Sequence, residues 1–210
     1  MSDVAEILAS EGFFMDRTLL DPGSRFSTIN PFLQQILVDV TNITCLGNMD
    51  EAGFRLGPDV FQDIIISVGC RLLRFHQLDK PRLRSKLESA CHIGLVVLST
   101  TLFIQIGRRR FLKYTLVGQY LKDVVEAGVD EGDNDLLLWL LLLGGISVLG
   151  GLEERWLAPR IRHVSHSLGI SSWEGVRQTL NELPWINALH SEPGKVLWET
   201  AMNNSAGSCV

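Results

Sequence analysis

The sequence has 210 residues, which is enough for one domain with a sizeable core. With 46% hydrophobic and 20% charged residues, it is typical of a globular chain and unlike a disordered one. A formal net charge of −5 argues against binding nucleic acid through a broadly basic surface.

The first half of the chain predicts helices separated by polar loops. A short helix over residues 2–11 and a loop over 12–30 come first. Proline then recurs at Pro31, Pro58 and Pro81, each time directly before a helical pattern, and the first helical position accepts proline well. Apolar residues three or four positions apart predict one buried face per helix. The side chains expected on the first two faces are Phe32, Leu33, Ile36, Leu37, Val40 and Ile43, then Val60, Phe61, Ile64, Ile65, Val68, Leu72 and Phe75.

The segment 81–106 is predicted to be a helix that begins basic and becomes apolar. The arginine run 108–110, with Lys113, follows it. We interpret this run as a solvated turn between helices, with a nuclear localisation patch or a phosphate contact as the alternative. The next helix leads into a polar loop over 128–135. Its apolar residues are Leu112, Leu116, Val117, Tyr120, Leu121 and Val124.

The centre of the chain is the charge-free run 136–152, which reads LLLWLLLLGGISVLGGL. Such a run is either a membrane span or a helix buried on every face. A span needs about 20 apolar residues and usually has a Lys/Arg bias at one end, whereas this run is shorter and has acidic flanks. We therefore predict a buried helix, in which Gly144 and Gly145 admit a close neighbour and the pair Gly150–Gly151 ends the helix. A small membrane-associated protein that uses 136–152 is the alternative.

Three further helices are predicted after this run. Residues 153–169 have an apolar stripe, and Gly169 is the expected C-terminal cap. Ser171 with Glu174 predicts a capping box for the second helix. The third helix is expected from about residue 193 to 202.

No segment has the alternation typical of a strand, so the predicted fold class is all-α. We expect a multi-helix array packed around the buried, glycine-bearing apolar helix 136–152. The predicted organisation is an N-terminal helix and loop over 1–29, partly flexible, then a helical domain over 30–202 and a disordered tail over 203–210.

The residue types that usually carry chemistry are present but not in diagnostic patterns. Cys45, Cys70 and Cys91 lie in apolar helical patterns and are interpreted as buried, reduced thiols, while Cys209 lies in the tail. No two cysteines have the Cys-x-x-Cys spacing of a metal site. His92 follows Cys91 directly, and adjacent helical residues point about 100° apart, so they do not form a nucleophile–base pair.

Two other candidates for a metal site are also weak. His163 and His166 lie one turn apart, but no third ligand matches them, so we expect both to face solvent. The acidic loop 130–135 lacks the closing glutamate of a calcium loop. We therefore predict no catalytic residue, no metal ligand and no cofactor. An enzyme of unrecognised type would need an apolar pocket with a perturbed acid or base.

The C-terminal third contains a more specific pattern of tryptophans and glycines. In order and spacing, over about residues 135–200, it resembles the C-terminal part of the regulatory domain of fungal-specific transcription factors of the zinc-binuclear-cluster class. The residues that carry the resemblance are Trp139, Gly144, Gly145, Trp156, Leu168, Gly169, Trp173, Trp185, Gly194, Leu197 and Trp198.

The resemblance implies a nuclear protein that acts in transcription regulation. Its partners would be proteins, either a second copy of the chain or a coregulator, or a small effector held among the helices. The family reads DNA with a cluster of six cysteines and two zinc ions, and no such cluster exists in this sequence, so direct DNA binding is not expected. We expect the four tryptophans after the central run to pin successive helices to this glycine-bearing run, because each buries roughly 150–250 Å².

Overall fold

The computed structural model describes residues 21–48, 57–78, 83, 85–106, 115–130, 132–149 and 154–203. Over these ranges the chain forms eight α-helices and no strand, which confirms the all-α prediction. Several predicted features lie outside the described residues: the helix 2–11, the arginine run 108–110 with Lys113, the glycine pair 150–151 and the tail after residue 203.

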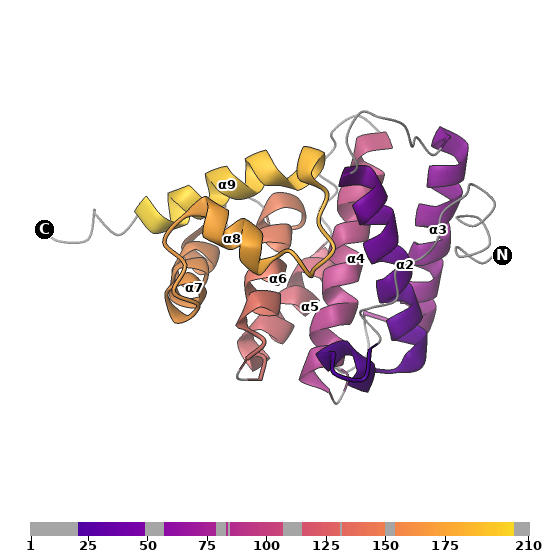
Figure 1. Cartoon of the computed structure of the whole chain (residues 1–210), viewed down its shortest axis with the longest axis horizontal. Helices are drawn as coiled ribbons and strands as arrows, with labels where there is room; N and C mark the ends of the chain where they lie inside the picture. The colour runs from indigo at the N-terminus through magenta and orange to yellow at the C-terminus, as the bar shows by residue number, and fades with distance from the viewer. Residues whose placement is uncertain are drawn as a thin grey trace, which may run out of the picture.

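The helices form one array in which neighbours in sequence are mostly neighbours in space (Figure 1). Helices α2, α3 and α4 lie at one end, α7, α8 and α9 lie at the other, and α5 and α6 lie between them. The elements are the 3-10 helix η2 (Arg25–Thr28) and the α-helices α2 (Pro31–Asn48), α3 (Pro58–Phe75), α4 (Lys86–Ile106), α5 (Thr115–Ala127), α6 (Asn134–Ser147), α7 (Glu154–Ser167), α8 (Trp173–Thr179) and α9 (Asn187–Asn203).

Helix α6 is the buried helix predicted from the central run. It packs against α4, α5, α7 and α9, and every residue from Leu138 to Gly144 is buried. Helix α6 ends at Ser147, three residues before the second glycine pair, which lies outside the described residues. The amides of Val148 and Leu149 both donate to the carbonyl of Gly144, at 3.0 and 2.8 Å, and this shared acceptor closes the last turn. Across the described residues, no helix is both long and apolar enough to cross a membrane.

The segment before α2 belongs to the packed array, although we placed the domain boundary at residue 30. Phe26 is 2% exposed and Ile29 is 3% exposed, and both are part of the main core. Arg25 donates to Asp133 at 2.9 Å and also to Asp135, so it ties η2 to the beginning of α6. These carboxylates raise the pKa of the Arg25 guanidinium. The described part of 1–29 is therefore an integral part of the fold.

Three helix boundaries differ from the predictions. Helix α4 begins at Lys86 rather than at Pro81, and α8 is capped by Ser172, whose hydroxyl accepts from the amide of Gly175 at 3.2 Å. The capping-box spacing had pointed to Ser171. Helix α9 begins at Asn187, six residues earlier than expected, and continues through Pro193.

A side chain distant in sequence explains the early beginning of α9. The side-chain oxygen of Asn48, at the end of α2, accepts from the amide of Asn187 at 2.7 Å. The amide group of Asn48 donates to the carbonyl of Trp185 at 2.5 Å. Asn48 therefore satisfies a backbone donor that the first turn of a helix leaves without an intrahelical acceptor.

Some side chains expected to be buried face outward instead. Phe32 is 42% exposed and Leu116 is 60% exposed. The buried face of α2 is centred on Leu33 and Ile36, and one residue of rotation, about 100°, turns Phe32 outward. Cys45 and Cys70 are exposed as well, so only Cys91 is the buried thiol that we predicted among the three described cysteines.

Candidate functional site in the C-terminal helices

The paired glycines of α6 bring three neighbouring helices close to its backbone. A methyl group at Gly144 would clash with the side chain of Leu121 in α5. A methyl group at Gly145 would lie 2.6 Å from Cδ2 of Leu157 in α7 and closer still to Leu197 in α9. The predicted close approach at both glycines is confirmed. Leu197 and Gly145, which are in contact, both belong to the tryptophan and glycine pattern of the C-terminal third.

Trp139 fixes α6 to α4 and to the segment before α9. Its ring is 1% exposed and lies against the α-carbon of Gly94 in α4. Its indole nitrogen donates to the carbonyl of Pro184 at 2.9 Å. Gly94 could not be predicted as a contact residue, because a single glycine in an apolar helix has no diagnostic pattern.

Two of the pattern tryptophans, Trp173 and Trp185, lie against Gly194 in α9, and Trp198 packs against Trp173. A methyl group at Gly194 would lie 3.0 Å from the ring of Trp173 and 3.2 Å from the ring of Trp185. The ring centroids of Trp173 and Trp198 are 6.5 Å apart. We call Trp173, Trp185, Trp198 and Gly194 the tryptophan cluster.

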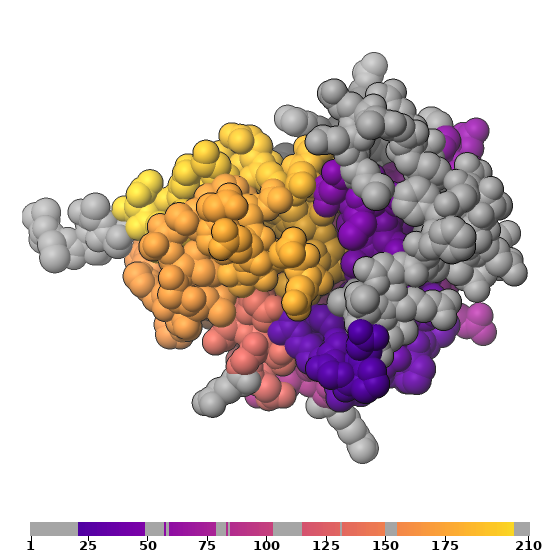
Figure 2. Space-filling model, in the orientation of Figure 1, coloured from indigo at the N-terminus to yellow at the C-terminus, as the bar shows by residue number. Residues whose placement is uncertain are grey.

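Hydrogen bonds orient the cluster. The indole nitrogen of Trp198 donates to the hydroxyl of Ser165 in α7 at 3.0 Å, and Ser165 is fully buried. The indole nitrogen of Trp185 donates to the hydroxyl of Ser191 at 3.3 Å. The cluster therefore joins α7, α8 and α9, which form one continuous surface at this end of the molecule (Figure 2).

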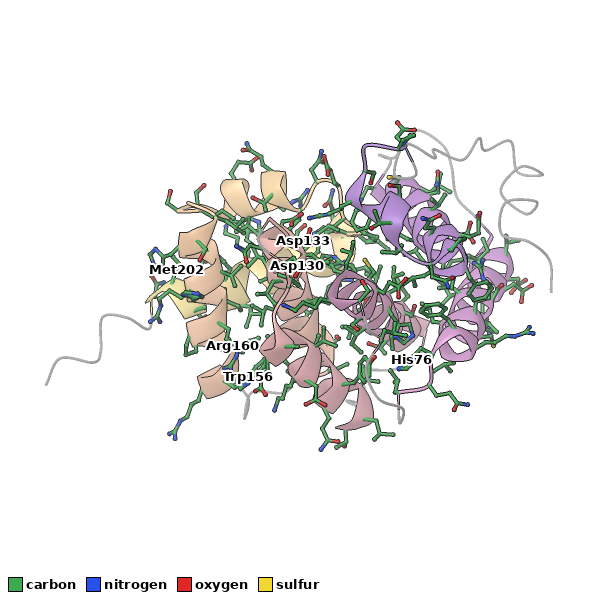
Figure 3. The ribbon with its side chains drawn as sticks, turned by 90° about the horizontal axis from the view of Figure 1, so that it is seen from below. His76, Asp130, Asp133, Trp156, Arg160 and Met202 are labelled. Carbon is green, nitrogen blue, oxygen red and sulfur yellow. The ribbon has the colours of Figure 1, made fainter. Side chains whose placement is uncertain are left out.

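Trp156 lies apart from the cluster, at the contact between α7 and α5. Arg160 and Lys122 lie over its ring, with the guanidinium carbon 4.3 Å and the ammonium nitrogen 5.5 Å from the centroid. The indole nitrogen donates to Glu126 at 3.1 Å. Trp156 and Arg160 lie next to each other at one end of α7 (Figure 3). Trp156 therefore stabilises a partly exposed contact between α5 and α7.

Leu168 and Gly169 form the predicted end of α7. Gly169 has a φ of +67°, which favours glycine, and its amide donates to the carbonyl of His166 at 3.0 Å. The amide of Ile170 donates to the carbonyl of Ser165 at 2.8 Å. Leu168 is half-buried and packs against the core. The predicted C-terminal cap is confirmed.

His190 forms a buried polar contact beside the tryptophan cluster. Its Nδ1 accepts from the amide of Ile186 at 3.0 Å, so Nε2 carries the hydrogen and donates to Thr101 Oγ1 at 2.8 Å. The Thr101 hydroxyl in turn donates to the carbonyl of Leu98 at 2.7 Å. Burial lowers the pKa of His190 to about 4, so the ring is neutral at physiological pH. Both ring nitrogens of His190 and the hydroxyl of Thr101 are thus engaged in hydrogen bonds within the protein, which is typical of a structural contact.

A second buried histidine lies between α3, α4 and α5. His92 is fully buried, and its Nε2 donates to the carbonyl of Leu72 at 3.1 Å. Burial is the main cause that lowers its pKa to about 4, and the neighbouring His76 adds to the effect. Rings of Phe75, His76 and Tyr120 surround it with centroids 5.6–6.3 Å away. This close aromatic packing makes His92 another structural contact.

The candidates for metal binding and nucleophilic chemistry stay separate. His163 and His166 are exposed, as predicted, and within the described ranges no group of three His, Cys, Asp or Glu side chains could hold a metal ion. Burial raises the pKa of the Cys91 thiol to about 12, so this thiol is a poor nucleophile. In the acidic loop, Asp133 binds Arg25 and Asp130 lies 3.6 Å from Lys86 (Figure 3).

Comparisons of the chain with protein-family models, curated proteins and solved structures found no match in any of the three. The resemblance to fungal regulatory domains therefore rests on the residues of the sequence alone.

Proposed function

We propose that this chain is a regulatory domain of the type found in fungal-specific transcription factors. It acts in the nucleus by binding protein partners or a small effector, and the 210 residues of this sequence contain no six-cysteine DNA-binding cluster. The observation that carries the proposal is the tryptophan and glycine pattern over about residues 135–200. Several of its members are also neighbours in space, since Gly145 contacts Leu197 and Gly194 contacts Trp173 and Trp185.

Neither buried histidine is placed to act as a general base, because both are fully enclosed by the protein. His92 and His190 are each bound to a backbone group and held neutral by burial. A general base has to present its lone pair to a substrate, and in His190 that lone pair already accepts from Ile186. The proposal therefore assigns no catalytic residue, metal ligand or cofactor to the chain.

The alternative, a membrane-associated protein that uses 136–152, has less support. Helix α6 is enclosed by α4, α5, α7 and α9, so its leucines already have protein neighbours. We expect the chain to remain in the supernatant after carbonate extraction of a membrane fraction. Recovery only in detergent would favour the alternative.

Gel-shift titrations test the claim that the chain does not read DNA. We expect no sequence-selective shift at physiological salt, because the chain is acidic and has no six-cysteine cluster. A nanomolar, sequence-selective complex would overturn this part of the proposal. Regulation itself is tested by tethering the chain to a heterologous DNA-binding module upstream of a reporter. We expect expression several-fold above or below that of the module alone.

A further inference from the structure

The outer face of α3 carries a row of exposed apolar side chains. Ile66 is 43% exposed, Leu73 is 54% exposed, and the thiol of Cys70 between them is exposed as well. Their spacing of four and then three positions places them on one stripe of the helix. We call Ile66, Cys70 and Leu73 the α3 stripe. The opposite face of α3 packs against α2 and α4.

Charges of opposite sign flank the α3 stripe at its two ends. Asp63 lies just before Ile66, Arg74 follows Leu73, and both are exposed. They are eleven positions apart, so at about 100° per residue they differ by only about 20° around the helix axis. The acidic and the basic side chain therefore lie along the same edge of the stripe.

We propose that the α3 stripe binds the same stripe of a second copy of this chain, with the two α3 helices antiparallel about a two-fold axis. Such an interface is self-complementary, because each copy contributes the same surface. In an antiparallel pair, the same edges of the two helices face each other. Asp63 of one copy then meets Arg74 of the other, and this pairing occurs twice. A parallel pair would bring opposite edges together and would lose both contacts.

The length of α3 indicates how strong this dimer is. Its 18 residues span about 27 Å. One helix face of this length is smaller than the roughly 800 Å² per partner of a standard interface. We therefore expect a dimer that forms and dissociates in the micromolar range. The inference names a partner for the proposed interaction domain and rests on that proposal for its biological role, but the dimer is measured independently of transcription.

Analytical ultracentrifugation of the full chain tests the interface. The sedimentation coefficient of the wild type is expected to rise from monomer towards dimer between low and high micromolar concentrations. The double variant Ile66→Asp/Leu73→Glu is expected to remain monomeric over the same range. Val196→Asp is the matched control, because Val196 is also 54% exposed but lies on α9, and it is expected to dimerise like the wild type. Circular dichroism of each variant shows that it is folded.

Charge reversal tests the orientation. Asp63→Arg or Arg74→Asp alone is expected to weaken the dimer about two- to five-fold, since exposed ion pairs contribute modestly. The double variant Asp63→Arg/Arg74→Asp is expected to restore it. Failure of the double variant to recover would rule out the antiparallel pairing.

Cross-linking provides a second measurement that does not depend on weakening the fold. Cys70 lies near the two-fold axis, so a short bismaleimide is expected to join two copies of a chain that carries Cys45→Ser and Cys209→Ser. A chain that retains the exposed Cys45 and carries Cys70→Ser and Cys209→Ser is the control, and it is expected to stay uncoupled.

A wild type that stays monomeric at every concentration overturns the inference. It is equally overturned by a dimer that survives Ile66→Asp/Leu73→Glu and is not cross-linked through Cys70. If the chain is monomeric but still regulates a reporter when tethered, the α3 interface is ruled out and the proposed function is retained.

Discussion

The indole ring of Trp139 in α6 lies directly against the α-carbon of Gly94 in α4. A methyl group at Gly94 would be 2.6 Å from Cη2 of the ring and closer still to Cζ3, which no real side chain tolerates. The ring cannot easily retreat, because its nitrogen is bound to the carbonyl of Pro184. The contact between α4 and α6 therefore requires glycine at position 94.

We expect Gly94→Ala to lower the free energy of unfolding by about 1–3 kcal/mol, because the added methyl group overpacks a fully buried ring. Gly118→Ala in α5 is the matched control. Its methyl group would lie 3.6 Å from Leu149, an ordinary contact, and alanine favours the helix by about 1 kcal/mol. Urea unfolding measures both variants. A free energy of unfolding for Gly94→Ala that equals or exceeds that of the wild type would show that the Trp139 ring moves to accommodate the methyl group.

Gly145→Leu tests the second close approach in α6. We expect it to lower the free energy of unfolding by about 1–3 kcal/mol or more, because the new side chain would overlap Leu157 and Leu197. The smaller variant Gly145→Ala should be partly rescued by Leu197→Ala, which removes one of the clashing methyl groups. Additive losses in the double variant would contradict this contact.

The two buried histidines predict acid-sensitive stability. Their pKa values are lowered from 6.5 to about 4 in the folded state, so the unfolded chain takes up protons first as the pH falls. Their contribution is fully present above pH 6.5 and is lost as the pH falls towards about 4. At about pH 5, each buried histidine should lower the free energy of unfolding by about 2 kcal/mol relative to neutral pH.

Urea unfolding at neutral pH and at about pH 5 measures this loss. His190→Gln should reduce the difference between the two conditions by about half, because one of the two titrating groups is removed. His163→Gln, at an exposed position, should leave the difference unchanged. A pH dependence identical in His190→Gln and the wild type would contradict the assignment.

Thiol labelling checks the burial of the cysteines. In a Cys209→Ser background, a thiol reagent should modify Cys45 and Cys70 in the native chain, because both are exposed. Cys91 should react only after unfolding, since it is 1% exposed and burial raises its pKa to about 12. Rapid native labelling of Cys91 would contradict the packing of α4.

Local patterns predicted the elements of the fold well. The helices after Pro31 and Pro58 begin where the prolines placed them, and α6 is buried as its charge-free sequence indicated. Gly169 has the positive φ that a helix cap requires. Each of these features depends on residues within one or two helical turns of each other, so the local sequence is enough to predict it.

Contacts between distant residues could not be predicted in the same way. Asn48 caps a helix that begins at Asn187, and Gly94 accommodates a ring from Trp139. The tryptophans were recognised as a set, but the contacts of Trp173 and Trp185 with Gly194 were not predicted. Helical periodicity shows which face of a helix is buried, but it does not show which helix covers that face.

The reporter assay tests the central claim most directly. The chain is fused to a heterologous DNA-binding module in fungal cells, and expression of the target gene is compared with that of the module alone. Gly194→Leu, which overpacks the tryptophan cluster, serves as the disrupted control, and Val196→Asp, on the outside of α9, serves as the intact one. We predict a several-fold change in expression with the wild type and Val196→Asp and none with Gly194→Leu. Expression equal to that of the module alone for all three stably produced fusions would contradict a regulatory role.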